Sequence, residues 1–167
     1  MSDDITARLA LPLLQPGQAQ KEATHNEALT LLDLAVQASV QAVGTNAPPA
    51  APAVGSAWIV GSAPSGGWTG QARSIAGWTA SGWRFVVPRE GMSVWSAGDG
   101  QTARFVGGAW TLGVLTGTRV SIGGFDVVGP RRAAVADPTG GTVVDVQARA
   151  AIFAILGVLR GHGLISG

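Results

Sequence analysis

Residues 82–106 read GWRFVVPREGMSVWSAGDGQTARFV, and this stretch decides the fold. Trp83, Phe85 and Val87 alternate with other residues, and this period of two places the larger apolar groups on one face of a strand. Two more short apolar runs flank the sequence Gly98-Asp99-Gly100, which is typical of a β-hairpin. The stretch therefore predicts short antiparallel strands joined by tight turns.

The same pattern extends from Val54 to about Val128. The chain has 25 glycines in 167 residues, which provides many places for tight turns. Roughly seven short strands with frequent turns predict a small antiparallel β barrel or sandwich. Trp83 and Trp95 fall in phase with apolar neighbours in these strands, so we expect both of them to be core residues.

A helix is predicted before this β region. Apolar residues recur at steps of three and four from Leu29 to Val43, which is typical of one face of a helix. Thr24 and Glu27 fit a capping box at its start, and Gly44 is expected to end it.

A second helix is predicted after the β region, over about residues 143–160, with Asp145 near its start, where an acid stabilises the helix dipole. The fold class predicted is α+β: an N-terminal helix, a small antiparallel β barrel or sandwich, and a C-terminal apolar helix. Its expected division is residues 1–44 (arm and helix, for docking or oligomerisation), 53–128 (tryptophan-rich β module) and 129–167 (loop and C-terminal helix).

An extended arm is predicted ahead of the first helix. Leu9–Gly17 is apolar and contains Pro12 and Pro16, neither of which suits a helix interior. The arm either packs onto another molecule or forms a strap over the protein's own core.

The low charge predicts a homo-oligomer. Charged residues make up 13% of the chain, against roughly 25% in an ordinary soluble domain, so part of the surface is expected to be buried against other chains. Isoleucines at seam positions of the second helix favour an assembly of three or four helices over one of two; the alternative is a core helix packed on the sheet. The interface candidates are the apolar residues of both helices: Leu29, Leu32, Val36, Ile152, Ile155 and Leu159.

Several classes of function find no support in the sequence. The chain has no cysteine and two histidines, and no nucleophile or phosphate-binding motif, so no catalytic residue, metal or cofactor is predicted. Glu90 is expected to pair with Arg84 or Arg89. The basic residues form no stripe, so nucleic acid is not an expected partner.

The termini and apolar runs bear on localisation. The N-terminus carries Asp3 and Asp4 and no basic region, so no signal peptide is expected. The longest apolar run, Ala150–Leu159, is too short for membrane insertion. We expect the protein to be made in the bacterial cytoplasm.

The tryptophans are the main functional signal. The chain has six tryptophans and no tyrosine, and all six lie between residues 58 and 110. Indole rings stack on sugars and also fill protein cores. Trp68 and Trp78 fall in glycine- and serine-rich turns, so we expect them to be exposed and take them as candidates for glycan binding.

Two stretches together resemble a known family. LALPLLQPGQAQKEATHNEALTLLDL (residues 9–34) and GWRFVVPRE (82–90), followed by FVGGAW (105–110), resemble an uncharacterised domain of tail-fibre and head-spike proteins. These proteins belong to alphaproteobacterial phages and gene transfer agents. The C-terminal segment, with GPR (129–131), ADPTGG (136–141) and RAAIFAILGVLRGHGLI (149–165), also resembles the usual ending of such proteins.

The resemblance implies a trimeric, non-catalytic virion component whose partners are other capsid, tail or spike proteins. It also implies a role in host attachment, because such spikes help particles adsorb to capsular polysaccharide. The chain ends soon after the β module, so an assembly or adaptor module with no ligand is the alternative. A glycan-cleaving spike is a third possibility.

Overall fold

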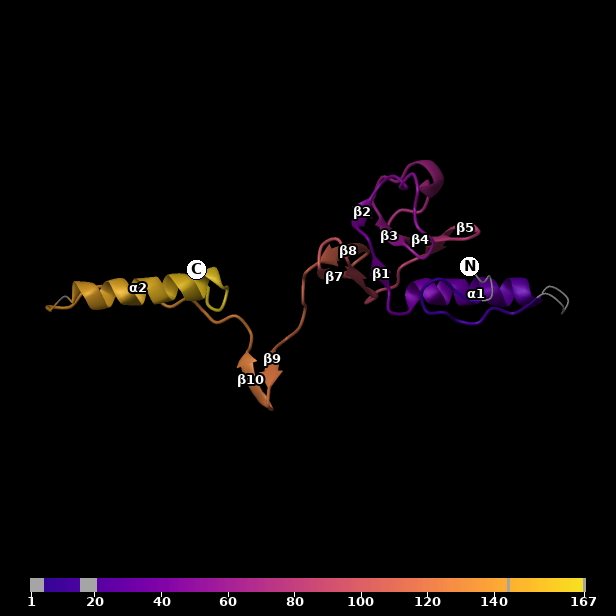
Figure 1. Cartoon of the computed structure of the whole chain (residues 1–167). Helices are drawn as coiled ribbons and strands as arrows, with labels where there is room; N and C mark the ends of the chain where they lie inside the picture. The colour runs from indigo at the N-terminus through magenta and orange to yellow at the C-terminus, as the bar shows by residue number, and fades with distance from the viewer. Residues whose placement is uncertain (1–4, 16–20, 144, 167) are drawn as a thin grey trace. The chain divides into compact units, whose positions relative to one another are not determined.

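The described residues, 5–15, 21–143 and 145–166, form an α+β structure in this computed structural model (Figure 1). It has an N-terminal helix, small sheets of short, mostly antiparallel strands, and a C-terminal helix, which confirms the predicted fold class. The chain divides into two compact units, Met1–Val114 and Leu115–Gly167.

The first unit contains two four-stranded sheets, ordered β2-β3-β4-β5 and β1-β6-β7-β8. Each sheet has one parallel pair, β2 with β3 and β1 with β6, and its other neighbours are antiparallel. The strands are β1 (Ser39–Val40), β2 (Val43–Thr45), β3 (Ala57–Val60), β4 (Ile75–Thr79), β5 (Gly82–Val86), β6 (Ser93–Ser96), β7 (Gln101–Val106) and β8 (Ala109–Leu112).

The two sheets share one hydrophobic core. Ile59 and Ile75 from the first sheet, Val94 from the second and Leu34 from the helix are all buried in one cluster. Alternation along the strands sends these residues inward and their neighbours to the opposite face of each sheet. The predicted hairpin around Gly98 and Gly100 is confirmed, since it joins β6 to β7.

Helix α1 (Lys21–Ala35) is shorter than predicted. Val40 and Val43, expected on its apolar stripe, lie in β1 and β2. The chain leaves the helix through Gln37, whose φ of 51° is in the left-handed region. The valines beyond this point are β-branched and fit strands better than helices, and periodicity alone did not reveal this. The predicted capping box is also wrong, because α1 already includes Lys21 and Thr24 lies inside it.

Residues 5–15 form a strap along α1, which is one of the two alternatives stated for the N-terminal arm. Pro16 and Gly17, at the end of the predicted arm, lie outside the described residues. Asp33 of the helix is buried, and its carboxylate accepts hydrogen bonds from Thr6 Oγ1 (2.7 Å) and from the backbone N–H groups of Arg8 (3.0 Å) and Leu9 (2.6 Å). The Asn26 side chain bonds both backbone polar groups of Leu14.

The strap also caps the end of the helix. The Arg8 guanidinium donates hydrogen bonds to the carbonyl oxygens of Asp33, Leu34 and Gln37. The last carbonyls of a helix lack partners within it and carry partial negative charge, so a cation placed there is stabilising.

The second unit contains a hairpin and helix α2 (Val146–Gly161). Strands β9 (Val120–Ile122) and β10 (Phe125–Val128) pair across a turn at Gly123-Gly124. Asp145 is the N-cap of α2, since its side chain accepts from Ala148 N at 2.8 Å. None of the helices in the described part of the chain has the length and apolar character needed to cross a membrane.

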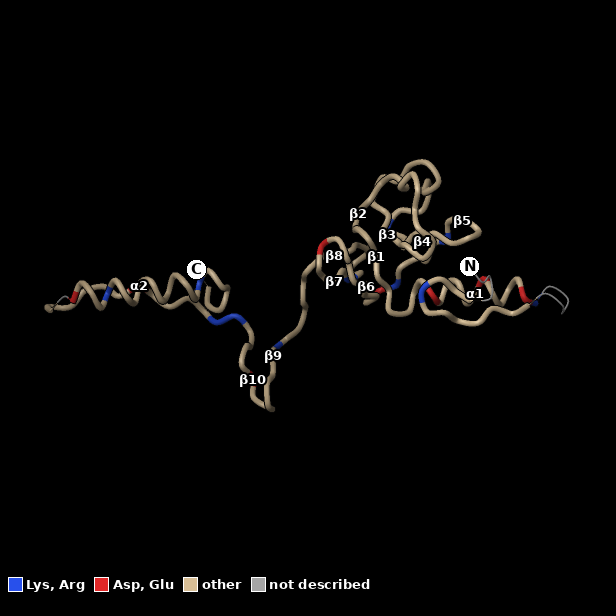
Figure 2. The backbone as a smooth tube through the Cα atoms, viewed as in Figure 1, with Lys and Arg blue, Asp and Glu red and all other residues tan. Residues whose placement is uncertain are grey.

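Segment 135–140 lies along α2 through two arginines. Arg160 bonds Asp137 and the carbonyl oxygen of Val135, and Arg149 bonds the carbonyl oxygens of Pro138 and Gly140. Charged side chains are few and scattered along the backbone (Figure 2).

Candidate functional site

Four tryptophans gather on the face of sheet β2-β3-β4-β5 that points away from the shared core. Trp58 and Trp83 come from β3 and β5, and the short 3₁₀ helix Gly66–Trp68 brings Trp68 onto them. Ring centroids are 5.1 Å apart for Trp68 and Trp83, and 5.7 Å apart for Trp58 and Trp83, both in edge-to-face geometry. Trp78, directly opposite Trp83 in the next strand, has its ring 4.9 Å away. We call this set the tryptophan face.

The expected exposure of Trp68 is wrong. Its side chain is 0% exposed, because the 3₁₀ helix turns the indole inward onto Val60, Ala76 and the neighbouring rings. Its Nε1 has no hydrogen-bond partner among the described residues. Trp78 is half-buried, so the prediction of an exposed residue is met only in part. Trp83 is also half-buried and packs against the buried cluster of Val60, Trp68 and Ala76.

Trp95 was expected in the core and is instead 49% exposed. In β6, Val94 and Ser96 are buried while Ser93 and Trp95 face outward. Strand alternation gives the phase of a residue, but it does not say which face the rest of the chain covers.

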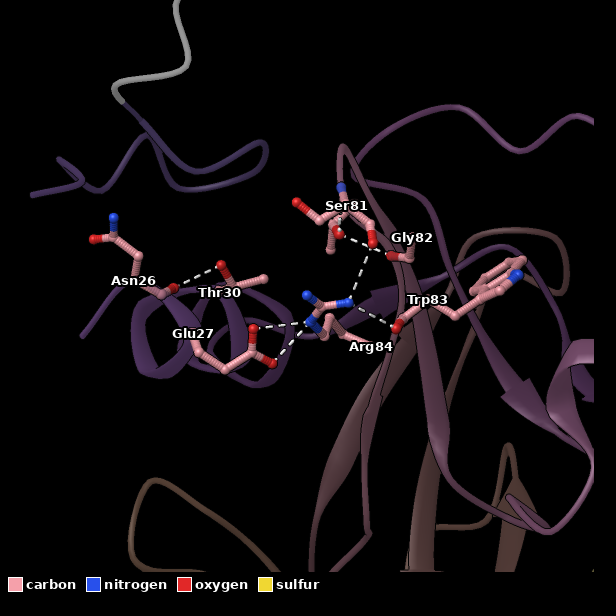
Figure 3. A network of polar contacts seen from close by, with 8 residues as sticks. Asn26, Glu27, Thr30, Ser81, Gly82, Trp83 and Arg84 are labelled. Carbon is pink, nitrogen blue, oxygen red and sulfur yellow. Dashed lines mark hydrogen bonds and ion pairs between the residues drawn. The ribbon is translucent and has the colours of Figure 1, made fainter. Parts of the chain in front are cut away.

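An ion pair joins α1 to β5. Glu27 contacts Nε of Arg84 through both carboxylate oxygens, at 2.8 and 2.9 Å (Figure 3). The same guanidinium donates through Nη1 to the carbonyl oxygens of Ser81 and Trp83, while Nη2 has no hydrogen bond to any described residue (Figure 3). The expected pair of Arg84 or Arg89 with Glu90 is therefore wrong: the Glu90 carboxylate instead accepts from Gly107 N.

A cleft of about 440 Å³ lies beside this ion pair. The strap, α1 and the β4–β5 turn form its walls, and Glu27, Thr30, Ser81 and Arg84 supply polar groups. Trp78 also lines the cleft, so this residue lies where the cleft meets the tryptophan face. The cleft thus offers a carboxylate, a guanidinium and hydroxyls, which can bond the polar groups of a ligand. The Trp78 indole lies on the opposite face of the sheet from the Arg84 side chain, because strand alternation turns Trp78 and Trp83 to one face and Gly77 and Arg84 to the other.

A family model for a protein of unknown function, DUF2793, matches residues 25–111. The chain belongs to the DUF2793 family. The match covers most of α1, all of β1 to β7 and all but the last residue of β8, so it includes the tryptophan face and the Glu27–Arg84 pair. Of the stretches on which the resemblance rests, residues 9–34 contain Glu27 and residues 82–90 contain Arg84. The C-terminal hairpin and α2 lie outside the match. A comparison with curated proteins finds no match for this chain.

The side chains of His25 and Asp99 in the DUF2793 region make local contacts. Within the described residues, no three His, Asp or Glu side chains lie together as a metal site. The Nδ1 atom of His25 lies 2.9 Å from the carbonyl oxygen of Lys21 in its own helix. The carboxylate of Asp99 accepts a hydrogen bond from Ser96 Oγ at 2.5 Å and belongs to the β6–β7 turn.

The interface candidates differ in accessibility. On α1, Leu32 and the adjacent Val36 are exposed and Leu29 is half-buried. On α2, Ile152 and Ile155 are exposed and Leu159 is half-buried. Their role in an oligomer stays a prediction.

Proposed function

We propose that this DUF2793 protein is a non-enzymatic spike or fibre component of a phage or gene transfer agent particle. In this role it works as a homo-oligomer, most readily a trimer, bound to other capsid, tail or spike proteins. It aids adsorption of the particle to cell-surface, capsular polysaccharide. The protein is made in the bacterial cytoplasm and becomes part of the particle.

The observation that carries the polysaccharide contact is the position of Trp78. Its ring packs against Trp83 on the tryptophan face, and the same residue contributes to the lining of the cleft that holds Glu27 and Arg84. Aromatic faces that adjoin directional polar groups suit saccharides, which have apolar C–H faces and hydroxyl edges. The buried Trp68 supports the neighbouring rings from beneath and takes no part in contact.

The exposed apolar side chains of the second unit support the oligomer. Among its described residues, the buried hydrophobic side chains are Leu156 and Ile165, while Ile155 and Val158 are 58% and 59% exposed. A helix that is apolar nearly all round requires cover on most sides. Copies of the same helix would supply that cover.

An adaptor that assembles the particle without binding a glycan is the second candidate. The mutual packing of Trp58, Trp68 and Trp83 favours it, because rings that fill a core stabilise a fold without any ligand.

Particle adsorption tests the proposal and separates the two candidates. Particles that lack the protein are expected to assemble but to adsorb poorly to encapsulated cells. Particles carrying Trp78→Ala should show the same adsorption defect, while the exposed control Val87→Ala should adsorb normally. Normal adsorption with Trp78→Ala argues for the adaptor, and normal adsorption of the deletion particles refutes the attachment role. Purified protein is expected to leave the chain length of the polysaccharide unchanged.

A further inference from the structure

The outer face of sheet β1-β6-β7-β8 carries an exposed indole in polar surroundings. Strand register places Ser39, Trp95 and Thr102 side by side across three strands. The next row holds Ser93, Arg104 and Thr111, again side by side. Alternation turns both rows to the side opposite Val94 and Ala103, which are buried in the core. We call these six residues the Trp95 face.

A hollow of about 350 Å³ adjoins this indole. It is lined by Trp95, Ser93, Thr102 and Val94 from the strands, and by Ala35, Gln37 and Ala38 at and just beyond the end of α1. Gln37 is exposed, and its left-handed backbone places it at the corner where the chain turns from α1 toward β1. The hollow therefore combines one flat aromatic ring with an amide and two hydroxyls.

Arg104 adds a positive charge to the Trp95 face. Its side chain is half-buried, and it has no ion pair with any acidic side chain in the described part of the chain. The backbone carbonyl of Arg104 accepts from Thr111 Oγ1 at 3.1 Å, which holds that hydroxyl next to it. A guanidinium without an acidic partner can bind a carboxylate through two parallel hydrogen bonds.

We propose that the Trp95 face binds a pyranose saccharide that carries a carboxylate, such as a uronic acid unit. The sugar ring would stack on the exposed indole, its hydroxyls would bond Gln37, Ser93 and Thr102, and its carboxylate would bond Arg104. The inference rests on the proposed attachment function and adds a second contact to it, on another sheet from Trp78.

The composition of this face favours a saccharide over a protein partner. The buried core of a protein–protein interface is more apolar than the surrounding surface and is depleted in charged residues. Here Trp95 is the one large apolar side chain in the two rows. The other five residues are two serines, two threonines and an arginine.

The test uses the purified full-length chain and three probes: oligogalacturonate and oligomannuronate as acidic saccharides, and maltohexaose as a neutral one. Each of the six indole N–H groups gives its own proton–nitrogen correlation signal, which assigns binding to individual tryptophans. We expect at least one acidic probe to shift the Trp95 signal. Trp95→Ala and Arg104→Gln should each weaken that binding by about tenfold or more, and Trp95→Phe should retain part of it.

The control Val87→Ala, at an exposed residue outside the Trp95 face, should leave this binding unchanged, and the other indole signals show whether each variant is folded. If no acidic probe shifts the Trp95 signal, the proposed site is wrong. Equal binding of maltohexaose contradicts the role of Arg104. A change in oligomeric state with Trp95→Ala assigns the face to a protein contact. None of these results depends on particle adsorption, so failure here is distinct from failure of the attachment role.

Discussion

At the scale of single residues, charged side chains in this protein hold segments together. Asp33 is buried, and it accepts three hydrogen bonds from the strap. Arg8 closes the end of α1, and Glu27 and Arg84 join α1 to β5. Because charged residues are only 13% of the chain, these four side chains together make up a substantial share of the charges in the first unit.

Replacement of Asp33 tests the attachment of the strap. Asp33→Asn turns one acceptor oxygen into an amide donor that faces other donors, so we expect a loss of about 2–3 kcal/mol in the free energy of unfolding. Urea unfolding followed by tryptophan fluorescence measures it, and this signal reports the first unit alone because all six tryptophans lie in residues 58–110.

The matched control for this change is Glu90→Gln. Glu90 is exposed, and its glutamine replacement keeps an acceptor for Gly107 N. We expect its effect to stay below about 0.5 kcal/mol. Equal stability of the two variants contradicts a structural role for the buried carboxylate.

The burial of single tryptophans could not be predicted from the sequence. Trp68 and Trp95 exchanged their expected places: the one in a glycine-rich turn is fully buried, and the one in a strand is 49% exposed. Local pattern correctly indicated turn and strand. Burial, however, depends on which other segments cover a face, and that requires contacts that are distant in sequence.

At the scale of elements, the contact of α1 with β4 shows how closely the helix meets the sheet. A Cβ atom added at Gly77 would lie 2.3 Å from Cδ2 of Leu34. Leu34 is itself 2% exposed and lies in the shared core, so its side chain has little room to move. The glycine is therefore needed for close approach, and its backbone conformation is ordinary.

A double-mutant cycle tests this packing. Gly77→Ala is expected to destabilise the first unit by about 1–3 kcal/mol through overpacking, and Leu34→Ala by about 2–5 kcal/mol through a cavity. Together they should cost less than their sum by about 1 kcal/mol or more, since the new methyl group occupies space that the leucine vacates. Strict additivity in urea unfolding would show that the two residues do not meet.

Turns and the N-cap of α2 could be predicted from the sequence, whereas the end of α1 could not. The hairpins at Gly98–Gly100 and Gly123-Gly124 and the cap at Asp145 follow from local turn and capping chemistry, and the structure contains all three. The end of α1 was missed because Val36, Val40 and Val43 satisfy helical spacing. Their β-branched side chains and the strands available to pair with them decide otherwise.

At the scale of the whole molecule, the DUF2793 match falls within the first unit and the most exposed apolar surface lies in the second. The hairpin β9–β10 is exposed on both faces. An isolated two-stranded hairpin is at best marginally stable in water. The second unit is therefore expected to find its remaining stability in contacts with other copies of the chain.

Sedimentation equilibrium at micromolar concentration tests that expectation. We expect the wild type to be an oligomer, most readily a trimer, and Ile155→Glu to dissociate it by burying a charge at the seam. The control Leu115→Glu, at a residue 97% exposed and outside the helix, should leave the oligomer intact. A wild-type monomer contradicts the proposal.

The parallel pairing of β1 with β6 has a consequence during translation. β1 and β2 are separated by Gln41 and Ala42 alone, yet they belong to different sheets. All strands of sheet β2-β3-β4-β5 have left the ribosome once Val86 has emerged, whereas β1 has no partner until β6 follows. In that interval the nascent chain presents Ile59 and Ile75 without the second sheet that covers them, and this is the stage at which chaperones have the most to protect.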